Sequence, residues 1–159
     1  MVERLLTGSE ERDLVRRGGA YATRLVDKGL RPEMVDQLRR HVAAGHETLF
    51  VSASLVYYLE PIARQFHMTD VIGVEPESVD GVLTGRLLHP NVRAAEKESR
   101  LRQWLGEPAQ GPIESLEMWA YGNSSGDHEL LAMADHAYWL GKPDRCPPTA
   151  VQFSPGGGF

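Results

Sequence analysis

Four side chains from separate parts of the sequence have the chemistry needed to handle a phosphoryl group. Ser52 offers a hydroxyl where a short apolar run ends, and Lys97 offers an ammonium near the start of a predicted helix. Asn123 and Asp127 lie four residues apart, in a turn that leads into another predicted helix. A hydroxyl and an ammonium can hold phosphoryl oxygens, and carboxylate and carbonyl oxygens suit Mg²⁺. This combination predicts phosphoryl-transfer chemistry.

Short apolar runs alternate with amphipathic segments along the chain. The strands and helices that they predict must position the four side chains. The runs have the length of buried strands, so they predict an α/β fold with a mostly parallel sheet. In such sheets the chemistry lies at the carboxyl ends of the strands. Asp80-Gly81, between two short extended pieces, predicts a hairpin. The predicted strands span residues 48–51, 71–74, 118–121 and 137–140.

The helix boundaries follow from capping residues and helix breakers. Two helices are predicted before residue 47, the first capped by Thr7 or Ser9 and the second running from Pro32 to Gly45. Ser54 is predicted to cap the helix that follows the first strand. Gly18-Gly19 weakens the first helix at its middle. Two later helices are predicted over residues 94–105 and 127–134.

Composition narrows the class of protein. The 159 residues carry a net charge of −5, which argues against a nucleic-acid-binding surface as the main feature. The single cysteine excludes an internal disulfide framework and any multi-cysteine zinc site. Because the sequence has neither an apolar run of about 20 residues nor a signal-peptide core, it predicts a cytoplasmic, soluble protein without a membrane span.

Three segments in a fixed order resemble the haloacid dehalogenase (HAD) superfamily, and specifically its phosphoserine-phosphatase-like subfamily IB. The segment GHETLFVSAS resembles the second family motif with its strand. The segment VDGVLTGRLLHPNVRAAEK resembles the hairpin and the approach to the third motif, and YGNSSGDHELLAMAD resembles the fourth motif. The resemblance implies a HAD-like, Rossmann-type three-layer fold. It also implies Mg²⁺-dependent hydrolysis of a small phosphorylated metabolite.

The same resemblance assigns expected roles to individual residues. Ser52 and Ala53 would bind the phosphate, and Lys97 would stabilise the charge that develops during transfer. Asp127 and Asn123 would serve the Mg²⁺ site. Taken singly, these residues have plainer interpretations: Ser52 can cap a loop, Lys97 can be a solvated helix residue, and the others suit a turn and a helix N-terminus. Their shared order favours the family interpretation.

Two departures from the family pattern bear on activity. The nucleophile motif Asp-x-Asp-x-Thr is missing, because no Asp-x-Asp occurs anywhere in these residues. In the family, its first aspartate forms an aspartyl-phosphate and its second acts as general acid and base. Asp80-Gly81-Val82-Leu83-Thr84 resembles that loop only superficially, since it fits the hairpin. The fourth motif has Asn123 where the family has aspartate, which removes a charge from the metal site.

A missing nucleophile motif also implies a missing first, central strand, and this shapes the expected organisation. Residues 1–46 are predicted to be a remnant of a helical cap, residues 47–142 the HAD-like core, and residues 143–159 a disordered tail. The gap in the sheet would be filled by a partner chain, by a second copy of this chain or by residues 149–153, or the two neighbouring strands would close up on each other. We expect a truncated, phosphatase-like hydrolase that is inactive alone. The alternative is a non-catalytic domain that binds phosphate or a partner.

Overall fold

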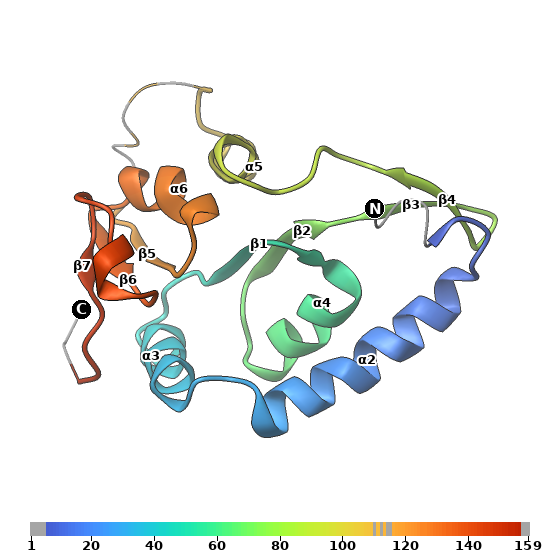
Figure 1. Ribbon diagram of the computed structural model, residues 1–159, viewed down its shortest axis with the longest axis horizontal. Helices are drawn as coiled ribbons and strands as arrows, with labels where there is room; N and C mark the ends of the chain where they lie inside the picture. Colours follow the sequence, from blue (N-terminus) through green and yellow to red (C-terminus); the bar gives the residue numbers. More distant parts are fainter. Residues whose placement is uncertain (1–5, 110, 112, 114–115, 157–159) are drawn as a thin grey trace. The chain divides into compact units, whose positions relative to one another are not determined.

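A computed structural model describes residues 6–109, 111, 113 and 116–156 of the chain. The chain divides into two compact units, residues 1–91 and 92–159; Figure 1 labels their elements. The first unit contains α2 (Glu11–Lys28), α3 (Pro32–Ala43), β1 (Leu49–Leu55), α4 (Val56–Gln65), β2 (Asp70–Val74), β3 (Pro76–Val79) and β4 (Val82–Leu87). The second contains α5 (Ala95–Leu105), β5 (Trp119–Gly122), the short turns η1 (Ser125–Asp127) and η2 (Pro143–Arg145), α6 (His128–Met133), β6 (His136–Trp139) and β7 (Val151–Gln152).

A parallel pair of strands with a crossover helix forms the centre of the first unit. β1 and β2 run side by side, with Leu49 opposite Asp70, and α4 connects them. The apolar face of α4 is buried, and Gly73 of β2 lets it approach closely: a Cβ at Gly73 would lie 2.9 Å from a Val56 methyl group. These elements confirm the predicted βαβ pattern.

Helix α2 packs against α4 at an unusually close approach. A Cβ at Gly18 would lie 2.7 Å from the carbonyl carbon of Tyr57, whereas a Cβ at Gly19 would meet nothing within 4 Å. Tyr57 also donates a hydrogen bond of 2.9 Å to Glu11. Burial, followed by this hydrogen bond, raises the pKa of Tyr57. Gly18 therefore makes room for α4, whereas Gly19 only weakens α2.

This difference gives a stability prediction with a built-in control. Gly18→Ala is expected to lower the free energy of unfolding by about 1–3 kcal/mol, because the added methyl group would collide with backbone atoms of α4. Gly19→Ala is expected to raise it by up to about 1 kcal/mol, since alanine is the better helix former. Urea unfolding followed by circular dichroism measures both. Equal effects of the two substitutions would show that the close approach at Gly18 does not affect the free energy of unfolding.

The predicted hairpin is confirmed as the antiparallel pair β3–β4. Asp80 and Gly81 both have positive φ, 50° and 78°, as a two-residue turn between twisted strands requires. The start of α2 is attached to this hairpin, since Leu83 donates to the Ser9 carbonyl and Glu11 donates to the Gly81 carbonyl. The Asp80 segment is therefore a structural turn, as its position in the sequence predicts.

A three-stranded parallel sheet in the order β5-β6-β7 forms the second unit. Trp139 of β6 and Leu131 of α6 are among its most buried side chains. The prediction of a disordered tail is wrong over the described part of residues 143–159, because Val151–Gln152 pair with β6 and Phe153 donates to the Trp139 carbonyl. Since β7 lies at the end of the sheet opposite to β5, residues 149–153 do not fill a place beside β5.

Two capping predictions are also wrong. Helix α2 begins after Glu10, without a side-chain cap from Thr7 or Ser9. Strand β1 continues through Ser54 to Leu55, so Leu55 rather than Ser54 precedes α4. Gly45 does end α3, with a φ of 79° that favours glycine.

β1 and β5 each lie at an edge of their own sheet. β1 pairs only with β2, and β5 pairs only with β6, among the residues that the structure describes. Residues 6–46 form helices and a single bridge from Glu10 to Val82. The division into a cap remnant and a core, and the missing central strand, stay predictions.

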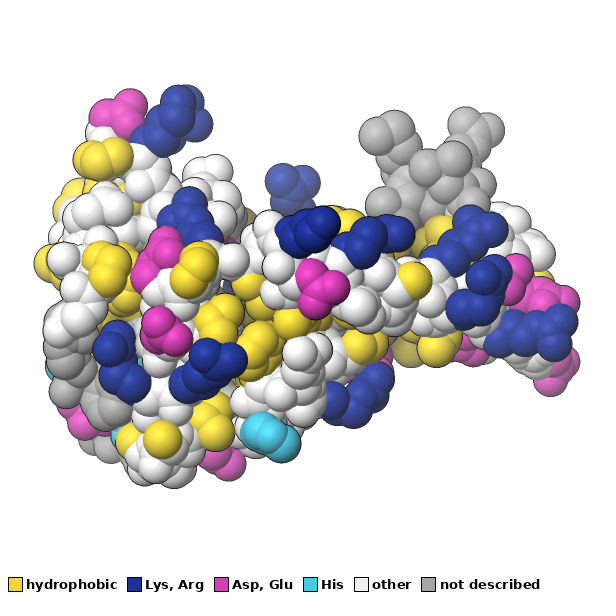
Figure 2. Space-filling model, turned by 90° about the horizontal axis from the view of Figure 1, so that it is seen from below, with side chains coloured by type: hydrophobic (Ala, Val, Ile, Leu, Met, Phe, Trp, Pro, Cys, Tyr) yellow, Lys and Arg dark blue, Asp and Glu magenta, His cyan; other side chains and the backbone are white. Residues whose placement is uncertain are grey.

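The surface carries charges of both signs. Figure 2 shows Lys and Arg side chains interspersed with Asp and Glu side chains on one face of the molecule. On α2, for example, exposed Arg16 pairs with Asp13. Within the described ranges, the structure has no helix that is both long and apolar enough to traverse a lipid bilayer.

Candidate active site

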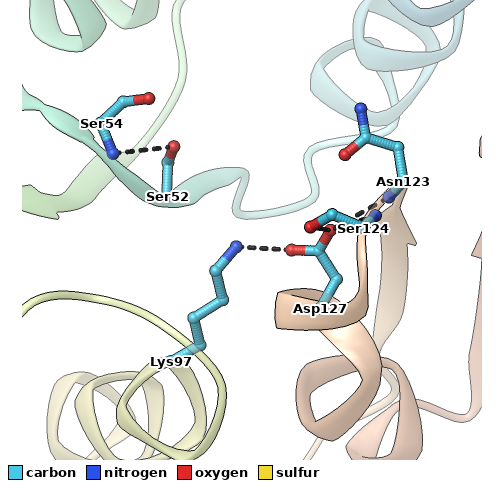
Figure 3. A network of polar contacts seen from close by, with 6 residues as sticks. All are labelled: Ser52, Ser54, Lys97, Asn123, Ser124 and Asp127. Carbon is cyan, nitrogen blue, oxygen red and sulfur yellow. Dashed lines mark hydrogen bonds and ion pairs between the residues drawn. The ribbon is translucent and has the colours of Figure 1, made fainter.

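Lys97 and Asp127 form a buried ion pair in the second unit. The Lys97 Nζ donates to Asp127 Oδ1 over 2.5 Å, and each side chain is only 9% exposed. Figure 3 shows the lysine extending from the first turn of α5 toward the carboxylate at the end of η1. The two elements are also joined by their backbones, since the Ala94 N–H donates to the Gly126 carbonyl over 3.3 Å.

The second oxygen of Asp127 holds the turn that carries it. Asp127 Oδ2 accepts the backbone N–H groups of Asn123 and Ser124 at 3.0 and 2.9 Å, and the Ser124 hydroxyl at 2.8 Å. Ser124 and Asp127 make a reciprocal capping box. Burial alone would raise the pKa of the Asp127 carboxyl, but the bond and charge of Lys97, then the bonds from Ser124 and Asn123, lower it below its ordinary value. The carboxylate therefore stays ionised and fixed in place.

Gly122 makes this turn sterically possible. It ends β5, and a Cβ at this position would lie 2.7 Å from the Asp127 Cβ. On the other side, the Leu140 N–H donates to the Gly122 carbonyl over 2.7 Å, which continues the ladder with β6. The strand end, the glycine and the capping box together aim the carboxylate at Lys97.

The donor set of the predicted metal site does not fit Mg²⁺. Asp127 Oδ2 accepts three hydrogen bonds and Oδ1 accepts the one from Lys97, so Asp127 can offer a metal at most one further acceptor position, on Oδ1. Asn123 is exposed and contributes a single neutral carbonyl oxygen, whereas Mg²⁺ takes about six oxygens in octahedral geometry. No group of three His, Cys, Asp or Glu side chains suited to a metal occurs in the part of the chain that is described.

Ser52 and Ala53 lie in the first unit, within β1. The Ser52 Oγ accepts the backbone N–H of Ser54 over 3.2 Å, which fixes the hydroxyl beside its own strand (Figure 3). Ser52 is half-buried and Ala53 is exposed. Ala53 also borders an open pocket of about 680 Å³ with Leu55, Val74 and residues 85–91. The structure thus brings Lys97, Asp127 and the backbone of Asn123 together in one unit and presents Ser52 and Ala53 in the other.

Sequence reasoning missed the roles of Ser124 and Gly122. The signal for Ser124 is present, since Ser124-Ser125-Gly126-Asp127 has the Ser-x-x-Asp spacing of a capping box. Gly122 carries no comparable signal. Glycine is required there because the folded turn brings Asp127 against it, and not because of its own backbone angles.

Comparison with known proteins decides the family. Residues 1–132 match the haloacid dehalogenase-like hydrolases. The chain belongs to this family. Among curated HAD relatives, the protein CicA of Caulobacter vibrioides is 34% identical over 146 residues, which cover 89% of this chain and 63% of CicA. The phosphoserine phosphatase SerB2 of Mycobacterium tuberculosis is 32% identical over 84 residues, covering 53% of this chain and 20% of SerB2.

Solved structures show the HAD fold as well. A Bordetella pertussis protein of unknown function superposes with a TM-score of 0.77 at 26% identity, covering 89% of this chain and 64% of that one. A probable phosphoserine phosphatase from Vibrio cholerae gives a TM-score of 0.66 at 22% identity, covering 94% and 44%. The HAD-like α/β fold and the phosphoserine-phosphatase-like resemblance are therefore confirmed. The chain spans less than two thirds of the length of these relatives.

Proposed function

We propose that this chain is a phosphatase-like HAD domain that holds the phosphoryl group of a small phosphorylated metabolite. The buried Lys97–Asp127 pair carries the proposal. An ammonium has three N–H donors, so a lysine fixed on Asp127 can hold a phosphoryl oxygen at the same time. Ser52 and Ala53 of the first unit are proposed to bind phosphate through the Ser52 hydroxyl and the backbone N–H groups of this part of β1.

The proposed reaction is phosphoryl transfer to an aspartate followed by hydrolysis. A carboxylate oxygen attacks phosphorus, the alcohol leaves with a proton from a second carboxylic acid, and water then cleaves the acyl phosphate. Lys97 neutralises charge on the phosphoryl oxygens throughout. None of the eight aspartates in these residues belongs to an Asp-x-Asp motif. The 159-residue chain alone is therefore proposed to bind the phosphoryl group without transferring it.

Two further proposals concern Mg²⁺ and a partner chain. Mg²⁺ binding by this chain alone is proposed to be weak or absent, because the oxygens that it needs are not supplied by Asp127 and Asn123. A complementing chain or a second copy is proposed to supply the missing central strand. A cytoplasmic location goes with a soluble metabolite as substrate.

The rival proposal, a non-catalytic remnant without a phosphate site, differs in a measurable way. Titrating inorganic phosphate into the isotope-labelled chain should shift the NMR signals of the Lys97 Nζ and of the Ser52 and Ala53 amides. Lys97→Met should weaken the binding by about 10- to 100-fold, because a hydrogen bond to a charged group contributes roughly 1.5–3 kcal/mol.

Lys142→Met is the matched control, since Lys142 is an exposed lysine of the same unit. It should leave phosphate binding unchanged. A parallel Mg²⁺ titration should produce no saturable shift at Asp127. If phosphate moves none of the three signals, the remnant interpretation is correct, and if Lys97→Met and Lys142→Met weaken binding equally, the phosphate is held by charge in general.

A further inference from the structure

The C-terminus of α3 is closed by two histidines. His41 is buried, at 6% exposure, and its Nδ1 lies 2.9 Å from the Nδ1 of half-buried His46. The His46 N–H donates to the His41 carbonyl, and the Gly45 N–H donates to the Val42 carbonyl. These two bonds, with left-handed Gly45 between them, make a Schellman motif. In that motif an apolar contact commonly joins the two residues that here carry the imidazoles.

The bond between the imidazoles depends on protonation. One Nδ1 donates and the other accepts, so at least one ring must lack a proton on its Nδ1. When both rings are protonated, the accepting lone pair is gone and two positive charges face each other. We propose that the His41–His46 pair is a pH-sensitive closure of α3, which holds the α3–β1 connection at neutral pH and releases it in mild acid.

The charged groups around the pair favour release. Arg40 of α3 precedes His41 and donates to the Gln37 side chain, which contacts the other nitrogen of His41. Arg39 of α3 and His67 at the end of α4 border a groove of about 360 Å³ beside the same helix end. Glu47 follows His46 and is exposed. Arg39 itself pairs with Asp36 over 3.5 Å, so the neighbouring cation that acts on His41 is Arg40, whose charge opposes protonation of the ring.

The sign of the pH dependence follows from His41. Burial, then the charge of His46, then that of Arg40 lower the pKa of His41 below 6.5. The native state therefore binds fewer protons than the unfolded state. The stabilisation is complete above about pH 6.5 and is lost as the pH falls through the folded pKa. Two imidazoles do not suffice for a zinc site, which takes four ligands, and in the described ranges no third His, Cys, Asp or Glu joins them.

Loss of this closure should stay local. β1 is anchored separately, because the Thr69 N–H donates to the Thr48 carbonyl at 2.8 Å and the Thr69 hydroxyl accepts the Thr48 N–H at 2.9 Å. Opening of the histidine pair therefore frees the connection between α3 and β1 without separating β1 from β2. This connection is also where the predicted cap remnant meets the predicted core.

Amide hydrogen exchange of the full chain, corrected for intrinsic rates, tests the proposal. Between about pH 7.5 and 5.5, protection at Gly45 and His46 should fall by about 10-fold or more, while protection at Thr69 should change by less than about 2-fold. In His46→Gln, which is neutral at both pH values, this pH dependence should become smaller, because burial and Arg40 still act on His41 but the facing imidazole is gone. His89→Gln, at an exposed histidine elsewhere, should retain it.

Two results would overturn the proposal. One is equal protection of Gly45 and His46 at both pH values in the wild type; the other is an unaltered pH dependence in His46→Gln. A ring ¹⁵N titration of the wild type decides the matter if the variant does not fold. The pKa of His41 should then lie below the usual histidine value, and a His41 pKa at or above that value would contradict the proposal.

Discussion

Replacing Lys97 with methionine is expected to lower the free energy of unfolding by about 3–5 kcal/mol. The substitution keeps the length and apolar bulk of the side chain but removes the ammonium. Asp127, which is buried against it, then becomes an uncompensated charge. Its three remaining hydrogen bonds come from Asn123 and Ser124, and none of them supplies a full positive charge. Urea unfolding near neutral pH measures the loss.

An exposed ion pair provides the control for this substitution. Arg64 pairs with Glu60 over 3.4 Å on α4, but the two side chains are 71% and 50% exposed. Arg64→Met should therefore change the free energy of unfolding by less than about 1 kcal/mol. The double variant Lys97→Met/Asp127→Asn should be less destabilised than the sum of the two single variants, because it leaves no buried charge unpaired. A Lys97→Met effect no larger than that of Arg64→Met would contradict the role assigned to the buried pair.

Patterns within a short stretch of sequence predicted most of the fold. The apolar runs gave β1, β2, β5 and β6 because buried parallel strands need apolar residues on both faces. Asp80-Gly81 specified its turn because both positions require positive φ. Pro32 and Gly45 marked the two ends of α3 for comparable backbone reasons. In each case the cause lies within a few residues of its effect.

Features that depend on partners distant in sequence could not be predicted in the same way. Val151–Gln152 lies in a tail rich in proline and glycine, and it forms a strand because it pairs with β6. Serine is a favoured residue at a helix N-cap, yet Ser54 lies within β1, which pairs with β2. Gly18 and Gly19 are equivalent in sequence, and only the packing of α4 separates them.

The candidate site shows the same division. Family order predicted Lys97 and Asp127, which lie 30 residues apart and meet as an ion pair. It did not predict that Asp127 would use Oδ2 to hold its own turn and Oδ1 to hold Lys97. That use of both oxygens is a property of the folded geometry, and it makes Asp127 a residue that positions the lysine.

The second large effect that we predict is the absence of phosphomonoester hydrolysis by this chain. Without an attacking aspartate, a phosphoryl group held as proposed by Lys97 would have no acceptor in this chain. Groups that bind a substrate equally well in the ground state and the transition state do not accelerate its reaction. The chain should therefore leave a phosphomonoester unreacted even where it binds inorganic phosphate. On this proposal, phosphate binding depends on Lys97, whereas transfer needs an attacking carboxylate of the Asp-x-Asp motif, which these 159 residues lack.

The most direct measurement is the hydrolysis of p-nitrophenyl phosphate by the purified 159-residue chain, with and without Mg²⁺. A matched preparation of Lys97→Ala reports any contaminating phosphatase. We predict that the wild type and Lys97→Ala release p-nitrophenol at the same rate as buffer, at every Mg²⁺ concentration. Mg²⁺-dependent release by the wild type that disappears in Lys97→Ala would contradict this account.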